Sequence, residues 1–145
     1  MKTKIVALIV ATWSCLILSL PALAENMIEF NTWSKGPGEL YQNKISETEL
    51  QKMPSWAPED GAPPLSVKQA VETARSYLKK KNSPFANAAI SEVKLDQFII
   101  PKYYKDKWCY IIMFMEVPVT CCTPGMMNVL VMMDGTVNEP VVVKY

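Results

Sequence analysis

The sequence predicts an α+β fold of two layers, in which one amphipathic helix packs on an antiparallel β-meander of about four strands. Two observations lead to this fold class. Apolar residues recur at helical spacing over about 67–81, and from residue 91 onward apolar residues alternate with a period of two. A helix followed by several short strands with tight connections is typical of a helix layer on an antiparallel sheet.

Residues 1–24 have the pattern of a cleavable signal peptide. Lys2 and Lys4 precede an almost unbroken apolar stretch, 5–20, and Ala22 and Ala24 supply small residues before the expected cleavage point. An uncleaved anchor is the alternative, but sixteen helical residues span only about 24 Å, less than the roughly 30 Å of a bilayer core. We therefore expect an exported protein, periplasmic or secreted, with no membrane attachment after cleavage.

Residues 25–64 are predicted to form an irregular N-terminal extension, because proline and glycine recur throughout them. One short helix is expected at about 47–53, where Ser46 and Glu49 have capping-box spacing and Pro54 ends the run. The extension also holds four aromatic residues: Phe30, Trp33, Tyr41 and Trp56. Disordered tails rarely carry so many aromatic side chains, so we expect part of the extension to lie against the folded domain.

The main helix is predicted over about 67–81. Ser66 and Gln69 have capping-box spacing, Asn82 marks the end, and Pro84 forbids continuation. One face of the helix is apolar: Val67, Ala70, Val71, Ala74, Tyr77 and Leu78. This face needs an apolar surface to cover.

The strands follow in succession, at 91–100, 108–117 and about 128–133. Asp134 and Gly135 then predict a two-residue hairpin turn of type I′. Because proline cannot donate to a strand ladder, Pro140 places the last short strand, 141–144, at a sheet edge.

Residues 65–145 resemble the small exported bacterial domains called PepSY and their PepSY-like relatives. The resemblance rests on the helix motif 66–74, the strand start 92–95, the aromatic strand 108–114 and the final strand and turn 129–137. It implies the fold and an extracytoplasmic compartment. It also implies a binding or inhibitory role, often beside secreted peptidases, with no recognised catalytic residues.

The chain contains no histidine, which excludes the common Ser-His-acid, Cys-His and zinc-histidine sites. After signal cleavage it keeps all 14 acidic residues and loses only Lys2 and Lys4 of its 15 basic ones, so its net charge is slightly negative. A nucleic-acid or anionic-membrane partner would need a strong basic bias. We expect no catalytic residues, no bound cofactor and no nucleic-acid partner.

The cysteines that remain after cleavage are Cys109, Cys121 and Cys122. Cys109 lies within the most apolar strand, so we expect it to be a buried small hydrophobe. Cys121 and Cys122 lie in a Pro-bounded loop just before Met126 and Met127. Thiolates and thioethers together suit Cu(I), so one hypothesis places a soft-metal or thiol-redox site at these four residues. The alternatives are disulfide chemistry at the cysteines and a strand that simply begins at the methionines.

Strand 108–117 is apolar on both faces, whereas one helix can cover only one face of a sheet. The second face must therefore be covered by the N-terminal extension, by a second copy of the chain, or by a protein partner. From the sequence we expect an exported, non-catalytic binding or inhibitory module of the cell envelope. The alternative is the soft-metal or thiol-redox protein that uses Cys121 and Cys122.

Overall fold

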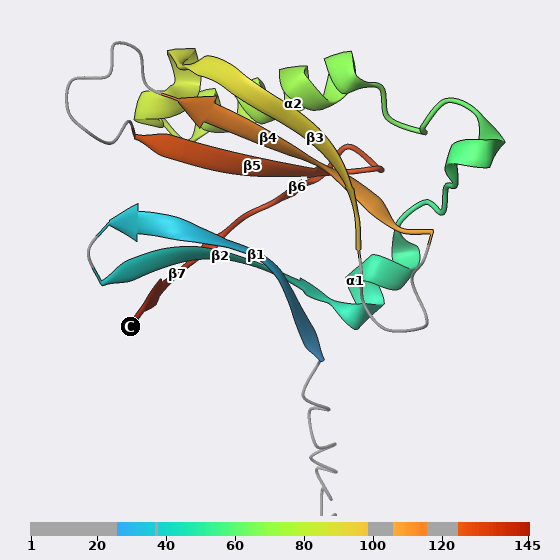
Figure 1. Ribbon diagram of the computed structural model, residues 1–145, viewed down its shortest axis with the longest axis horizontal. Coiled ribbons are helices and arrows are strands. Elements are labelled where there is room, and N and C mark those ends of the chain that lie inside the picture. The colour runs from blue at the N-terminus through green and yellow to red at the C-terminus, as the bar shows by residue number, and fades with distance from the viewer. Residues whose placement is uncertain (1–25, 37, 99–105, 116–124) are drawn as a thin grey trace, which may run out of the picture.

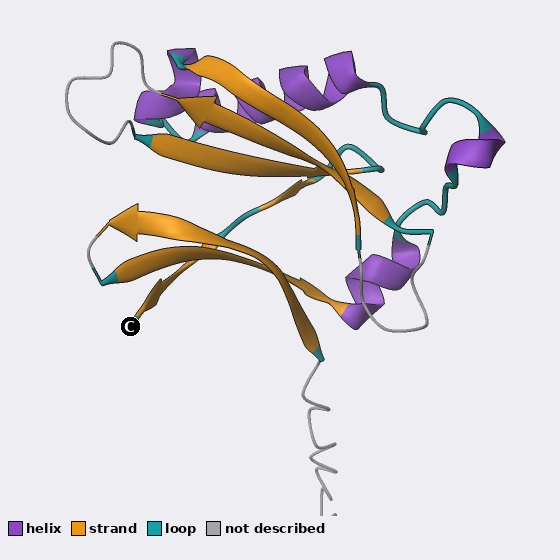
Figure 2. Cartoon of the chain, in the orientation of Figure 1, coloured by secondary structure: helices purple, strands orange, loops and turns teal. Residues whose placement is uncertain are grey.

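The computed structural model describes residues 26–36, 38–98, 106–115 and 125–145. The predicted signal peptide, 1–24, lies outside these residues, and so do Cys121 and Cys122. The described chain forms an α+β fold, which confirms the predicted class, but it has three layers instead of two (Figures 1 and 2). A helix lies on one face of a four-stranded sheet, and a three-stranded sheet lies against the other face.

The elements in chain order are β1 (Met27–Gly36), β2 (Glu39–Ser46), α1 (Glu47–Lys52), η1 (Pro58–Asp60), α2 (Val67–Lys80), η2 (Pro84–Asn87), β3 (Ala89–Gln97), β4 (Trp108–Met115), β5 (Met126–Met132), β6 (Val137–Asn138) and β7 (Val141–Lys144). The four-stranded sheet has the order β3-β4-β5-β6 and the three-stranded sheet the order β1-β2-β7. All the strand pairings are antiparallel. Within the described part of the chain, no helix is long and apolar enough to cross a membrane.

The prediction that residues 25–64 are irregular is wrong for the first half of that segment. Strands β1 and β2 form a hairpin, and α1 follows at once. Gly36 and Gly38 lie at the hairpin end, where Gly38 has φ +73°, and Gly61 follows η1 with φ +94°. Helix α1 begins as predicted, because the Ser46 side chain accepts from the Glu49 N–H while the Glu49 carboxylate accepts from the Ser46 N–H.

Helix α2 begins at the predicted capping box of Ser66 and Gln69 and buries Ala70, Ala74 and Leu78 completely. Val71 and Tyr77 pack at the edge of the same core. Val67 was predicted to be on the buried face, but its side chain is 51% exposed. The reason is that Leu65, which precedes the N-cap, fills the core at that end of the helix.

Strand β4 has two buried faces, as its sequence predicts. Tyr110, Ile112 and Phe114 belong to the core under α2. Cys109 belongs to a second core between the two sheets, with Ile111 packed against it. The other buried members of that second core are Ile45, Leu50, Met53, Phe98, Leu130 and Met132. The N-terminal segment therefore covers the second apolar face, which was one of the three predicted possibilities.

Two of the aromatic residues noted in the N-terminal segment, Phe30 and Trp56, pack against the main domain, as was expected for part of this segment. The Phe30 ring meets the Phe98 ring edge-on, with centroids 4.7 Å apart. The buried Trp56 ring meets the Trp108 ring in the same way at 5.4 Å. Edge-on aromatic pairs of this kind add to the stability gained from apolar burial.

The turn after β5 differs from the predicted type I′ hairpin. The Gly135 N–H donates to the Met132 carbonyl (2.9 Å), and the Met132 N–H donates to the Thr136 carbonyl (2.8 Å). Gly135 has φ +84°, whereas Asp134 is not among the residues with positive φ. The loop is therefore a three-residue turn with glycine in the left-handed position, the usual alternative to the two-residue turn.

The fourth strand of the main sheet is the short β6, and β7 crosses to the other sheet to pair with β2. Pro140 lies between them and has no N–H to continue the pairing with β5. Strand β7 is at the edge of its sheet, as Pro140 predicts.

Candidate binding pocket between helix α1 and the β5–β6 turn

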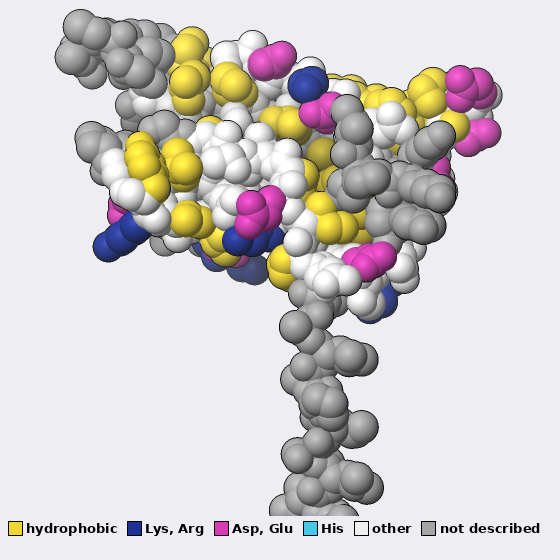
Figure 3. All heavy atoms as spheres, turned by 60° about the horizontal axis from the view of Figure 1, so that its bottom comes forward, with side chains coloured by type: hydrophobic (Ala, Val, Ile, Leu, Met, Phe, Trp, Pro, Cys, Tyr) yellow, Lys and Arg dark blue, Asp and Glu magenta, His cyan; other side chains and the backbone are white. Residues whose placement is uncertain are grey.

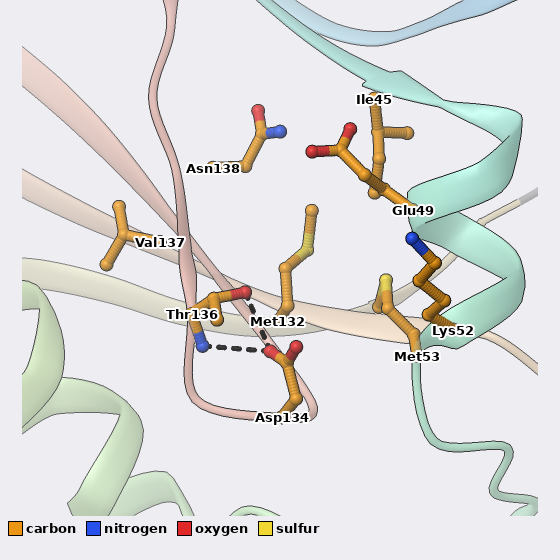
Figure 4. A pocket seen from close by; sticks show the side chains of 9 residues that line it. All are labelled: Ile45, Glu49, Lys52, Met53, Met132, Asp134, Thr136, Val137 and Asn138. Atoms are coloured by element: carbon orange, nitrogen blue, oxygen red, sulfur yellow. Dashed lines mark hydrogen bonds between the residues drawn. The ribbon is translucent and has the colours of Figure 1, made fainter.

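A pocket of about 300 Å³ opens where α1 and the β5–β6 turn meet at the margin of the two sheets (Figure 4). This volume is at the lower end of the range for small-ligand pockets, so it suits one long side chain or a small molecule. The residues that line it are Ile45, Glu49, Lys52, Met53, Met132, Asp134, Thr136, Val137 and Asn138.

The floor of the pocket is apolar. Ile45, Met53 and Met132 are buried members of the core between the sheets, and Val137 packs at the margin of the core under α2. Methionine side chains are unbranched and adaptable, so two of the four floor residues can adjust to the shape of a guest.

Two carboxylates enter the pocket from opposite walls, with Met132 between them in Figure 4. Glu49 uses Oε2 for the capping box, accepting from the Ser46 N–H (3.1 Å) and hydroxyl (2.9 Å). Asp134 uses Oδ1 for the turn, accepting from the Thr136 N–H (2.9 Å) and hydroxyl (2.7 Å). Local structure thus holds both carboxylates in place through one oxygen each.

The third wall is fixed by an amide pair. Asn43 Nδ2 donates to Asn138 Oδ1 (2.8 Å) and to the Asn138 carbonyl (3.0 Å), and Asn138 Nδ2 donates to the Lys44 carbonyl (2.8 Å). Asn43 has no exposed surface. Because these bonds join β2 to β6, the pocket is formed by rigid elements before any guest arrives.

The side chains that line the pocket are suited to binding a guest and not to reacting with it. Its single hydroxyl, on Thr136, is bonded to Asp134 as part of the turn, a local contact common for aspartate two residues before threonine. The pocket therefore supplies apolar contact and charge to a guest.

A second, smaller pocket of about 140 Å³ reaches Cys109. The thiol is free, its residue is 2% exposed, and burial raises the pKa of Cys109 to about 12. A thiol with so high a pKa is a poor nucleophile and a poor metal ligand. Cys109 is a buried hydrophobic side chain, as its place in the strand predicts.

Of the four residues of the predicted soft-metal site, the structure describes Met126 and Met127, while Cys121 and Cys122 lie outside the described residues. Met126 and Met127 are consecutive residues of β5, so their side chains point to opposite faces of the sheet. Met126 is exposed, while Met127 packs against the core under α2, so the two thioethers cannot bind one ion together. Across the described ranges, no group of three or more Cys, Asp or Glu side chains is placed to hold a metal.

The pocket is not evident from the sequence pattern. Both local signals that build it, the Ser46–Glu49 capping box and the Asp134–Gly135 turn, are present in the sequence, but neither indicates that the two lie side by side in the fold. The candidate methionines were Met126 and Met127, whereas the pocket uses Met53 and Met132.

No protein-family model, no curated protein and no solved structure matches this chain.

Proposed function

We propose that the chain is an exported, non-catalytic binding module of the cell envelope, whose protein partner inserts a side chain into the pocket between α1 and the β5–β6 turn. The observation that carries this proposal is the pocket itself, with its apolar floor and charged rim. The signal-peptide pattern of residues 1–24, the absence of histidine and the PepSY-like resemblance support the compartment and the non-catalytic role.

The partner is not expected to use the second face of the main sheet, because the chain itself covers that face with β1, β2 and α1. Figure 3 shows the molecule with the three-stranded sheet turned forward, and its hydrophobic side chains lie there in small separate groups among polar and charged ones. Such dispersed apolar groups are ordinary for a solvated surface. A concave pocket with a buried apolar floor is a better anchor for a partner.

Random peptides displayed on phage test this proposal when they are selected on the folded chain. Lys52 lies on the pocket rim and Lys68 on the exposed side of α2, so Lys52→Trp and Lys68→Trp form a matched pair. The proposal predicts a selected sequence family that binds the original chain and Lys68→Trp but binds Lys52→Trp at least tenfold more weakly. Equal binding to the two variants, or no enrichment, contradicts the proposal.

A further inference from the structure

The two carboxylates of the pocket each keep one oxygen without a protein partner within the described residues. Glu49 Oε1 and Asp134 Oδ2 take no part in the hydrogen bonds that fix their side chains. The neutral polar groups beside them are different, because both amide groups of the Asn43–Asn138 pair are engaged with each other or with the backbone. The acceptors left for a guest are therefore carboxylate oxygens.

The charge of the rim favours a cation. Glu49 and Asp134 are opposed by a single base, Lys52, which has no ion pair among the described residues. An acidic guest would meet two like charges. A purely apolar guest would displace water from the free carboxylate oxygens without replacing its hydrogen bonds, which is unfavourable.

We infer that the guest is a basic side chain, lysine or arginine, of the protein partner; this inference rests on the proposed function and specifies its chemistry. The aliphatic stem of such a side chain packs on the apolar floor of Ile45, Met53 and Met132, and its cationic end donates to Glu49 Oε1 and Asp134 Oδ2. Long basic side chains commonly bury the stem and keep the charge at the rim. Hydrogen bonds between a cation and a carboxylate are stronger than neutral ones.

The test uses N-butylguanidinium chloride, which reproduces the end of an arginine side chain. It is added to the ¹⁵N-labelled chain, and binding is measured from the changes in amide chemical shifts. Guanidinium chloride without the butyl stem and 1-pentanol without the charge are matched probes at equal concentration and ionic strength. We expect saturable shifts at the amides of Met53, Asp134 and Thr136 with N-butylguanidinium, at a Kd at least fivefold lower than that of either partial probe.

Asp134→Asn is the main variant, because asparagine keeps an oxygen for the Thr136 contact and replaces the free oxygen by a donor. It should weaken N-butylguanidinium binding at least fivefold and leave 1-pentanol binding unchanged, whereas Glu72→Gln on the exposed side of α2 should change neither. A thermal melt within two degrees or so of the original chain shows that the turn is intact. Any of three results overturns the inference. They are binding of 1-pentanol as tight as that of N-butylguanidinium, chemical-shift changes that lie away from the pocket, and N-butylguanidinium binding that Asp134→Asn does not weaken.

The inference and the proposed function fail separately. If the selected peptides need the open pocket but bind equally well after their basic residues are replaced by norleucine, the binding function stands and the basic guest is wrong. If N-butylguanidinium binds as expected but no peptide does, the pocket chemistry stands and the protein-binding function is wrong.

Discussion

Asn43 and Asn138 are 95 residues apart in the chain, and their side chains bond to each other at 2.8 Å across the junction of the two sheets. The Asn43 amide also donates to the Asn138 carbonyl, and the Asn138 amide donates to the Lys44 carbonyl. This pair ties the N-terminal hairpin to the last strand of the main sheet. Asn138 also lines the candidate pocket, so the hydrogen bonds that join the two sheets also fix one wall of the site.

Replacing Asn43 by leucine should lower the free energy of unfolding by about 2–3 kcal/mol. The substitution leaves the partly buried Asn138 oxygen without its Asn43 donor, and a polar group that is left unsatisfied costs more than the lost bond alone. Urea denaturation at neutral pH measures the change. A loss below about 0.5 kcal/mol would show that the amide pair does not hold the sheets together.

Asn128 should respond in the opposite direction. Its Oδ1 is buried and has no hydrogen-bond partner among the residues that the structure describes. The side chain lies in β5 between Met127 and Val129. Leucine is similar in size to asparagine but has no unsatisfied acceptor, so Asn128→Leu should raise the free energy of unfolding by about 1 kcal/mol. The same denaturation experiment measures it, and a clear destabilisation would indicate an ordered water or another partner at this oxygen.

Helix α2 should be sensitive at Leu78 and insensitive at Val67. Leu78 has no exposed surface, so Leu78→Ala should cost about 2–4 kcal/mol as a core truncation. Val67 is half exposed in the first turn, and Val67→Ala should change stability by no more than about 0.5 kcal/mol, because alanine also favours the helix. Thermal or urea unfolding measures the change in stability for both variants. Equal losses of stability would mean that the buried face of the helix is assigned incorrectly.

Cys109 should make stability fall with rising pH in the alkaline range. Burial raises the pKa of its thiol from 9.0 to about 12 in the folded chain, so above pH 9 the unfolded chain loses a proton that the folded chain retains. The cysteine therefore contributes its full share of stability below pH 9 and loses it progressively as the pH approaches 12.

The measurement for Cys109 is the difference in unfolding free energy between the original chain and Cys109→Ala, taken at pH 8 and pH 10.5. The other titrating groups cancel in this difference. We expect the advantage of the original chain to shrink at the higher pH. We also expect maleimide to reach the Cys109 thiol only after unfolding, with the labelled residue identified by mass spectrometry because Cys121 and Cys122 also carry thiols. A constant difference, together with fast labelling of Cys109 in the folded chain, would mean that Cys109 is accessible.

The helix and the two-faced strand could be predicted because local signals specify them. The capping box at Ser66 and the apolar spacing of α2 determine where the helix lies and which face it buries. The alternation in β4 separates Tyr110 and Ile112 from Cys109. The edge position of β7 followed from Pro140. Each of these features depends on residues close together in the sequence.

The N-terminal hairpin and the pocket could not be predicted in the same way. Strands β1 and β2 mix polar and apolar residues because only one face is buried, and β1 carries register shifts that interrupt its alternation. The pocket depends on the meeting of α1, which carries Glu49, with a turn near the C-terminus, which carries Asp134. Each residue has an adequate local role in its cap or turn, so nothing in the local pattern reveals that they share a cavity.

Photo-crosslinking from the pocket rim, in cells that produce the chain, tests whether a protein partner occupies the pocket. A photoreactive phenylalanine derivative replaces Lys52, and the same residue at Lys68 on α2 is the control. We expect a discrete protein adduct from position 52 that is absent from position 68, with the crosslink mapped by mass spectrometry to one partner segment beside a lysine or arginine. The same adducts from both positions, or none from position 52, would contradict the proposed binding of a partner in the pocket.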